Sequence, residues 1–320
     1  MTQPSDVGDT RPEILIATPL PARDIAPLES QFLIHRYDQA SDKPAFLAGC
    51  RKVRAMLTSG HTGADAALIA ALPALEIITC FGVGVDGVDF EATRARGIPV
   101  TNTPDVLTGD VADLAIALAL SVMRDIPKAD AHVRAGKWTS GTLPLARRFF
   151  GSKIGILGMG RIGLATAERA RGFGCEIGYF NRSAKPGLPY EAFETPQTLA
   201  AWADVVIITL AGGAGTRAIM DAAAIEALGP TGYLVNVSRG STVDEAALIE
   251  ALQTGKIAGA GLDVFLNEPN IDPRFAELHN TVLMPHLGSA TDETRRAMGQ
   301  LMRDNLAAHF AGQPLLTPVE

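Results

Sequence analysis

The sequence predicts an α/β protein made of two Rossmann-like domains, each a doubly wound parallel sheet, with a cleft between them. Short apolar, β-branched runs alternate with longer Ala- and Leu-rich segments of helical period, which is typical of repeated βα units. A chain of 320 residues also exceeds what one hydrophobic core usually serves. With 47% hydrophobic and 20% charged residues, the composition is that of a chain folded throughout.

The strands are expected in two series. The second follows a basic, Gly-containing stretch at 147–153, and its six strands suit a doubly wound sheet. The first series comprises 13–18, 32–37, 55–58, 76–81 and 98–101, and the second comprises 153–157, 176–180, 205–209, 232–237, 258–264 and 282–284.

Two helices are expected to organise the domains. Residues 106–134 are apolar on nearly every face, so an interdomain or subunit interface should cover this helix. Residues 291–310 form a helix that we expect to cross back to the first domain. The predicted domains are therefore 1–101 completed by 289–320, which is flavodoxin-like, and 102–288.

Charge and cysteine content exclude several classes of function. The net charge of −7 has no basic cluster, so neither nucleic acid nor an anionic membrane is an expected partner. Cys50, Cys80 and Cys175 lack metal or redox spacing, which indicates buried thiols in a reducing compartment and no metal site. Residues 1–10 carry no signal-peptide pattern, and the apolar run 114–123 is about half the roughly 20 residues of a membrane span. We expect a cytoplasmic protein.

A glycine loop follows the strand at 153–157. Gly158, Gly160 and Gly163 have the dinucleotide-binding spacing, and 165–170 has helical composition. Gly158 would turn tightly, Gly160 would let a pyrophosphate approach the backbone, and Gly163 would let helix and strand touch. The alternative is a tight strand-to-helix turn without a ligand.

The position that reads the cofactor ribose falls after the next strand. An acidic residue there favours NAD, but this chain has Asn181, Arg182 and Ser183, which offer donors and no carboxylate to a 2′-phosphate. We therefore expect NADP(H) to be preferred, with NAD(H) possible. The alternative is that Arg182 is a solvated loop charge.

Three polar residues follow apolar strands in the second half of the chain: Arg239, Glu268 and His286. Ligands of open parallel sheets bind at that edge. Reduction of a 2-oxo acid needs a cation for the carboxylate and carbonyl, which is Arg239, and a proton donor, which is His286 stabilised as imidazolium by Glu268. Taken singly, the alternatives are a helix cap for Arg239, a surface turn for Glu268 and a core histidine for His286. Upstream, the run 81–86 ends a strand and offers amides to a carboxylate, or is only a glycine turn.

With these motifs the chain resembles the D-isomer-specific 2-hydroxyacid dehydrogenases over nearly its whole length. Within that family it is most similar to the NADPH-dependent hydroxypyruvate, glyoxylate and hydroxyphenylpyruvate reductases. The motifs that carry the resemblance are 81–86, 101–108, 110–114, the glycine loop, 181–183, 236–240, 261–265 with 268–269, and 285–288.

The resemblance implies the Arg, Glu and His roles given above, and makes the first domain the substrate-binding one and the second the dinucleotide-binding one. It also implies that the amides of Val83 and Gly84 hold the substrate carboxylate, that Asp263 binds the nicotinamide carboxamide and that Thr108 lies near the cofactor. Arg161, Ile162, Val237, Ser238 and Gly288 complete the expected cofactor set.

The resemblance further implies a homodimer built through the cofactor domain, which fits the apolar helix at 111–123. Trp138 is the candidate for a tryptophan that reaches the partner's active site. One departure is the run Leu-Ala-Gly-Gly-Ala-Gly at 210–215, where the family usually has a Pro-Leu-Thr type loop.

The predicted function is NADPH-dependent reduction of hydroxypyruvate to D-glycerate and of glyoxylate to glycolate. Aryl pyruvates such as hydroxyphenylpyruvate are the nearest substrate alternative. A dinucleotide-sensing corepressor is the alternative from a different class, although no basic patch favours it. A zinc dehydrogenase is not expected, because no cysteine stands beside a histidine at ligand spacing.

Overall fold

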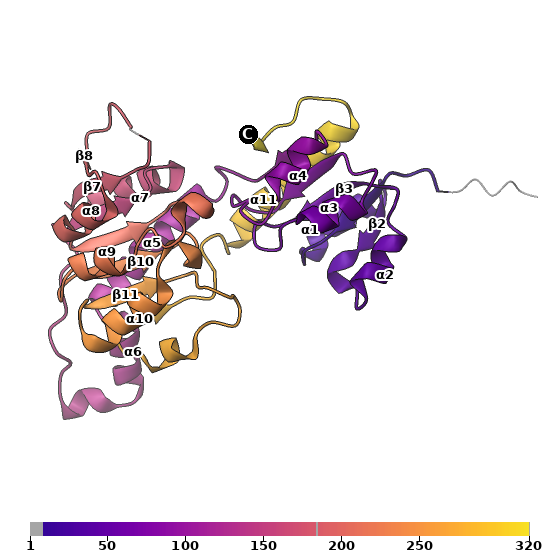
Figure 1. The fold of residues 1–320 in the computed structure, drawn as a ribbon. Helices are drawn as coiled ribbons and strands as arrows, with labels where there is room; N and C mark the ends of the chain where they lie inside the picture. The colour runs from indigo at the N-terminus through magenta and orange to yellow at the C-terminus, as the bar shows by residue number, and fades with distance from the viewer. Residues whose placement is uncertain (1–8, 184, 320) are drawn as a thin grey trace, which may run out of the picture. The chain divides into compact units, whose positions relative to one another are not determined.

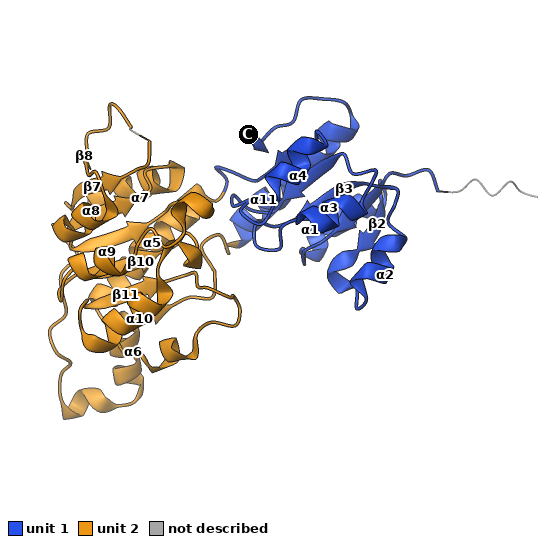
Figure 2. Ribbon diagram, viewed as in Figure 1, with its two compact units in different colours: residues 1–106, 292–320 blue, residues 107–291 orange. Residues whose placement is uncertain are grey.

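The computed structural model describes residues 9–183 and 185–319. The chain forms two compact α/β units, one made of residues 1–106 and 292–320 and the other of residues 107–291 (Figure 2). The boundaries expected from sequence were 101/102 and 288/289. Each unit has its own sheet and its own core, and the prediction of two doubly wound parallel sheets is confirmed.

The sheet of unit 1 has the strand order β13-β5-β4-β3-β1-β2. All pairings are parallel except that of β13, which runs antiparallel along β5. The order β2-β1-β3-β4-β5 is that of flavodoxin-like sheets. The strands are β1 (Glu13–Ile16), β2 (Leu33–Arg36), β3 (Val53–Thr58), β4 (Ile77–Cys80), β5 (Val100–Thr101) and β13 (Pro318–Val319).

Five α-helices belong to the described part of unit 1 (Figure 1): α1 (Ala22–Glu29), α2 (Lys43–Ala48), α3 (Ala66–Ala71), α4 (Phe90–Ala95) and α11 (Asp292–Phe310). The last helix, α11, packs against α1 and β4. An ion pair between buried Asp24 and Arg303 ties α11 to α1, and Gly299 leaves the space for the carboxylate, because a Cβ there would meet Asp24 Oδ1 at 1.9 Å.

Unit 2 contains an all-parallel sheet of seven strands in the order β12-β11-β10-β9-β6-β7-β8. This is the Rossmann order with one strand added beyond the sixth. The central strands are fully buried, as expected of strands covered on both faces. The strands are β6 (Lys153–Leu157), β7 (Glu176–Phe180), β8 (Glu191–Ala192), β9 (Val205–Ile208), β10 (Tyr233–Asn236), β11 (Gly259–Leu262) and β12 (Thr281–Leu283).

The α-helices of unit 2 are α5 (Thr108–Met123), α6 (Ile126–Arg134), α7 (Arg161–Gly172), α8 (Pro196–Trp202), α9 (Ala222–Ala227) and α10 (Glu245–Thr254) (Figure 1). Helix α5 packs against α7, β10 and β11, and helices α8 to α10 contribute to a core cluster on the sheet. None of the described helices is long and apolar enough to cross a membrane.

The single helix expected at 106–134 is wrong, because this segment forms two helices. It breaks at Arg124 and Asp125, because Pro127 cannot continue a helix and Asp125 takes a left-handed conformation with φ of 51° before α6 begins. The buried face of α5 packs on α7, β10 and β11 of its own unit, whereas α6 has no buried residue, and the interface expected over this segment stays a prediction.

Candidate active site

Three predicted catalytic residues stand just beyond neighbouring strands of unit 2. Arg239 follows β10, Glu268 follows β11 and His286 follows β12, and these strands are adjacent in the sheet. Because all three strands are parallel, their carboxyl ends lie at one edge. The structure therefore brings the three residues to the same edge of one sheet.

Glu268 and His286 form a direct hydrogen bond. Nδ1 of His286 lies 2.6 Å from Oε2 of Glu268, and Oε1 of the same carboxylate accepts from the N–H of Phe265 at 2.8 Å. The Glu268 side chain is 17% exposed, whereas that of His286 is 41% exposed. Nε2 of His286 has no partner among the described residues, so it is the ring nitrogen available to a ligand.

The loop that carries Arg239 packs tightly on the loop that carries Glu268. A Cβ on Gly240 would lie 2.0 Å from the carbonyl carbon of Phe265, so only glycine permits this approach. The Arg239 carbonyl accepts from Asn236 Nδ2 and Thr242 Oγ1, and its guanidinium donates to the Ser238 carbonyl at 2.8 Å. These contacts fix the backbone from which Arg239 projects.

Asp263, at the end of β11, holds the segment around His286 in place. It is 1% exposed, and its two oxygens accept from the N–H groups of Leu287 and Gly288 at 2.6 and 2.8 Å. The His286 N–H donates to the Asp263 carbonyl at 2.9 Å. Burial raises the pKa of the Asp263 carboxyl, while the two amides act in the opposite direction. A contact between Asp263 and the nicotinamide carboxamide stays a prediction.

The glycine loop has the geometry that a dinucleotide requires. A Cβ on Gly158 would meet the backbone of Leu210, and one on Gly163 would lie 2.2 Å from the Gly158 carbonyl, so both glycines are demanded by the fold. Gly160 is different, since nothing lies within 4 Å of its would-be Cβ. It is also the N-cap of α7 and supplies no side-chain cap, which leaves the first amides of the helix to an anion. The residues present therefore fit a bound pyrophosphate.

The three residues expected to read the ribose follow β7. Asn181 organises the turn, because its Oδ1 accepts from the N–H of Met159 at 3.2 Å and its Nδ2 donates to the Ser183 carbonyl at 2.8 Å. Arg182 and Ser183 are exposed. The amide of Asn181 is thus occupied in tying this turn to the glycine loop, and Arg182 carries the charge that can meet a phosphate.

Other expected cofactor residues surround the same loop. Arg161 and Ile162 begin α7, Thr108 begins α5, and α5 packs on α7. Val237 and Ser238 are buried directly after β10, and Ser238 Oγ donates to the Leu210 carbonyl. Ser238 therefore joins the β10 end to the 210–217 segment beside the glycine loop.

The expected carboxylate-binding amides lie in unit 1, in the loop after β4. Thr103 Oγ1 accepts from the Gly82 N–H at 3.0 Å, and Asn102 Nδ2 donates to the Val83 carbonyl at 2.8 Å. The N–H groups of Val83 and Gly84 donate to no acceptor among the described residues. They are available to an anion, although their role stays a prediction.

Sequence reasoning did not consider Arg295 on α11. Its guanidinium lies over the Phe81 ring, 5.6 Å from the centroid, immediately before the Gly82 to Gly84 turn. Burial lowers the pKa of Arg295. The only signal in the sequence was an arginine on the buried side of a helix, which is too common to indicate a site.

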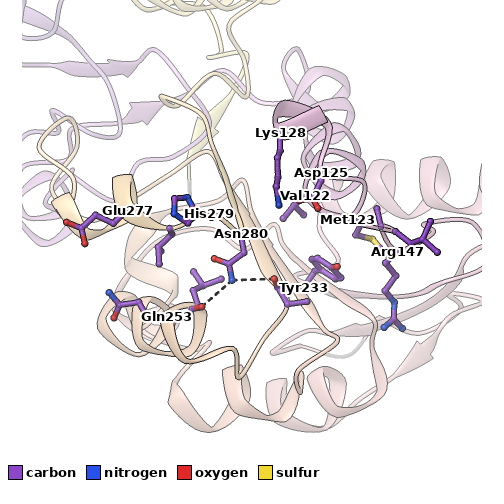
Figure 3. Close-up of a pocket in the computed structure, with 15 residues that line it drawn as sticks. Val122, Met123, Asp125, Lys128, Arg147, Tyr233, Gln253, Glu277, His279 and Asn280 are labelled. Carbon is purple, nitrogen blue, oxygen red and sulfur yellow. Dashed lines mark hydrogen bonds between the residues drawn. The ribbon is translucent and has the colours of Figure 1, made fainter. Parts of the chain in front are cut away.

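Two further features lie away from this edge. Trp138 is 68% exposed in a short 3₁₀ helix at Lys137–Ser140. A cavity of about 710 Å³, lined by Tyr233, Asn280, Lys128 and His279 among others, adjoins the amino ends of β10 and β12 (Figure 3). It is therefore at the opposite edge from Arg239 and His286. No cluster of metal-ligating side chains exists within residues 9–183 and 185–319.

A dinucleotide-binding α/β sheet with a histidine–carboxylate pair and an arginine at its carboxyl edge defines an oxidoreductase site. Residues 116–288 match the family described as D-isomer specific 2-hydroxyacid dehydrogenase, NAD binding domain. The chain belongs to this family, so it is an oxidoreductase with a nicotinamide dinucleotide-binding domain. The prediction of family and of cofactor class is confirmed.

Relatives are similar over almost the whole chain. Hydroxyphenylpyruvate reductase of Plectranthus scutellarioides is 47% identical, covering 91% of this chain and 94% of the relative. The solved 2-hydroxyacid dehydrogenase of Ketogulonicigenium vulgare is 52% identical with a TM-score of 0.91, covering 98% and 99% of the two chains. The NADPH-dependent glyoxylate/hydroxypyruvate reductase of Sinorhizobium meliloti, solved with NADP and malonate, is 42% identical with a TM-score of 0.89, covering 97% of each chain.

The double acceptor role of Asp263 predicts a large effect from Asp263→Asn. The substituted amide would present its NH2 group to one of two backbone donors, which should lower the free energy of unfolding of unit 2 by about 2 kcal/mol. Asp244→Asn is the matched control, because Asn caps α10 as well as Asp does. Trp138 and Trp202 both lie in unit 2, so urea unfolding followed by tryptophan fluorescence measures the difference. Equal losses in the two variants would contradict the assignment.

Proposed function

We propose that this protein is an NADPH-dependent reductase of small 2-oxo acids that converts hydroxypyruvate to D-glycerate and glyoxylate to glycolate. The observation that carries the proposal is the 2.6 Å hydrogen bond from Nδ1 of His286 to Glu268, which leaves Nε2 available to a substrate. The similarity to the NADPH-dependent glyoxylate/hydroxypyruvate reductase of Sinorhizobium meliloti supports this substrate class.

The residues divide the work of carbonyl reduction. When bound, the nicotinamide supplies the hydride that the carbonyl carbon receives. Arg239 binds the substrate carboxylate and polarises the carbonyl, together with the amides of Val83 and Gly84. His286, protonated, donates its Nε2 proton to the oxygen as negative charge develops there, and a 2-hydroxy acid results. Glu268 keeps the ring oriented through its contact with Nδ1 and so directs Nε2 to the substrate.

The remaining predicted residues hold the cofactor. Gly158 to Gly163 and the first amides of α7 take the pyrophosphate, and Arg182 with Ser183 takes the 2′-phosphate of NADPH. Residues 181–183 include no carboxylate that would repel this phosphate, which supports a preference for NADPH over NADH. Asp263 would bind the nicotinamide carboxamide, and Thr108 would lie near the cofactor.

Reduction of hydroxyphenylpyruvate or another aryl pyruvate is the second candidate. It is favoured by the 47% identity to the Plectranthus scutellarioides enzyme. Pocket volume alone changes discrimination between such substrates by only about 1 to 3 kcal/mol, so both classes can be accepted to different extents.

We also propose a cytoplasmic homodimer that forms through the cofactor unit. The support is a row of exposed apolar side chains at 126–150, namely Ile126, Val133, Trp138, Leu145 and Phe150. Trp138 would enter the partner's active site.

The three cysteines support the proposed location in the cytoplasm. Burial raises the pKa of the Cys80 thiol to about 12. The thiols of Cys50 and Cys175 are also buried and form no disulfide, which is typical of proteins in reducing compartments. Recovery of the native protein from an exported fraction would contradict the location.

Replacement of the proposed proton donor or anchor tests the mechanism. His286→Gln and Arg239→Leu should each lower kcat/KM for glyoxylate and hydroxypyruvate by at least a hundredfold, because each removes charge or proton donation in the transition state. The Kd for NADPH, followed by quenching of protein fluorescence, should change less than about threefold. Unchanged turnover in either variant would overturn the assignment of that residue.

A substrate panel decides among the candidate functions. NADPH oxidation with glyoxylate, hydroxypyruvate, pyruvate and hydroxyphenylpyruvate should give the highest kcat/KM for one of the first two acids. The same assay with NADH should give a higher apparent KM for the cofactor. A ranking led by hydroxyphenylpyruvate would favour the aryl pyruvate alternative, and tight cofactor binding without any turnover would favour a dinucleotide-sensing regulator.

Sedimentation measures the proposed dimer. The wild-type protein should sediment as a dimer at micromolar concentration, and Leu145→Glu should shift it to monomer, since a buried unpaired carboxylate opposes association. Leu316→Glu, at an exposed leucine of unit 1, is the matched control and should leave the dimer intact. Trp138→Ala should keep the dimer and lower kcat/KM. A monomeric wild type would contradict the proposal.

A further inference from the structure

The segment at 210–217, whose first six residues depart from the usual family loop, has a defined conformation. At its start, the Leu210 carbonyl accepts from Ser238 Oγ, and just beyond its end the Ala218 N–H donates to the Ser241 carbonyl at 2.8 Å. Inside it, Thr216 Oγ1 donates to the Ala211 carbonyl at 2.8 Å. The loop is therefore anchored at both ends and internally, and it begins where Gly158 touches Leu210.

This loop receives a side chain from the turn after β7. A Cβ on Gly215 would lie 2.9 Å from Nη1 of Arg182, so the guanidinium lies directly on the glycine. The backbone of Gly215 does not have a positive φ, which means that alanine fits its conformation but not its contact. Gly215 thus provides the space in which the Arg182 guanidinium lies against this loop.

A second cation stands two residues further along. Arg217 is exposed and directly precedes the anchored Ala218. Neither Arg182 nor Arg217 forms an ion pair or a hydrogen bond with any other described residue. Some other arginines of unit 2 do pair with carboxylates, as Arg147 does with Asp204 at 2.5 Å. Two positive charges on neighbouring loops without a described counter-charge form a site for an anion.

We propose that the loop at 213–217 is the second wall of the site for the adenosine 2′-phosphate, with Gly215 positioning the Arg182 guanidinium and Arg217 supplying a second positive charge. The inference rests on the proposed preference for NADPH. It assigns a function to the end of the run at 210–215, which departs from the family pattern, and to Arg217 just beyond it. A doubly charged phosphate monoester is the ligand class that two guanidinium groups bind best.

Binding of two nucleotide fragments to the full-length protein tests the loop without catalysis. Isothermal titration with 2′,5′-ADP and with 5′-ADP isolates the contribution of the 2′-phosphate. Gly215→Ala and Arg217→Gln should each weaken 2′,5′-ADP binding by about tenfold, as expected for loss of one charge-assisted contact, and change 5′-ADP binding less than twofold. The loss should shrink at high salt.

Matched controls come from the far end of α7, roughly 18 Å from the glycine loop by helix rise. Arg171 is an exposed arginine there, and Gly172 has nothing within 4 Å of its would-be Cβ. Arg171→Gln and Gly172→Ala should leave both affinities unchanged.

The titration outcomes distinguish failure of the proposed loop role from failure of the proposed preference for NADPH. A wild type that prefers 2′,5′-ADP, with variants that keep that preference, would overturn the role of the loop alone. Equal weakening of both fragments would also overturn it, because the effect would then be structural. A wild type that binds both fragments equally would overturn the NADPH preference and the inference with it.

Discussion

The hydrogen bond between Glu268 and His286 joins the ends of two neighbouring strands, and the chemistry of the site depends on it. It fixes which ring nitrogen is available to a ligand and places a carboxylate beside the group that is the proton donor in the proposed mechanism. The carboxylate is itself held by the Phe265 N–H, and His286 by the buried Asp263. These contacts thus hold His286, a loop residue with φ of 55°, in a fixed position relative to the sheet.

The glycines of unit 2 fall into two groups, those that the packing of the chain requires and those that it does not. Gly158, Gly163 and Gly240 stand where a methyl group would strike backbone, so the packing of loops explains them. Nothing lies within 4 Å of a Cβ built on Gly160, so the packing of the chain itself does not require glycine there. A ligand that must approach the backbone does explain it. Gly215 is intermediate, because a Cβ built there would meet only the end of the Arg182 side chain and no backbone.

Much of the fold was predictable because buried parallel strands are short, apolar and bounded by turns, and the positions of β6, β7 and β12 differ from expectation by one residue or less. The short strands β8 and β13 were not predictable, since two residues carry no periodicity. The break between α5 and α6 depended on Pro127, which was overlooked within an apolar run. Of the site, residue types at strand ends were predictable, whereas the contacts that hold them depend on how distant segments meet.

The cofactor loops illustrate that limit. From sequence, Asn181, Arg182 and Ser183 look like three equivalent donors to a phosphate. In the structure, the Asn181 amide is used to bind Met159 and Ser183, so it orders the turn rather than extending from it. That order directs Arg182 toward a loop from another strand connection, where a glycine provides space. In the proposed site, recognition of the cofactor charge therefore depends on two loops, and a motif confined to one of them describes only half of it.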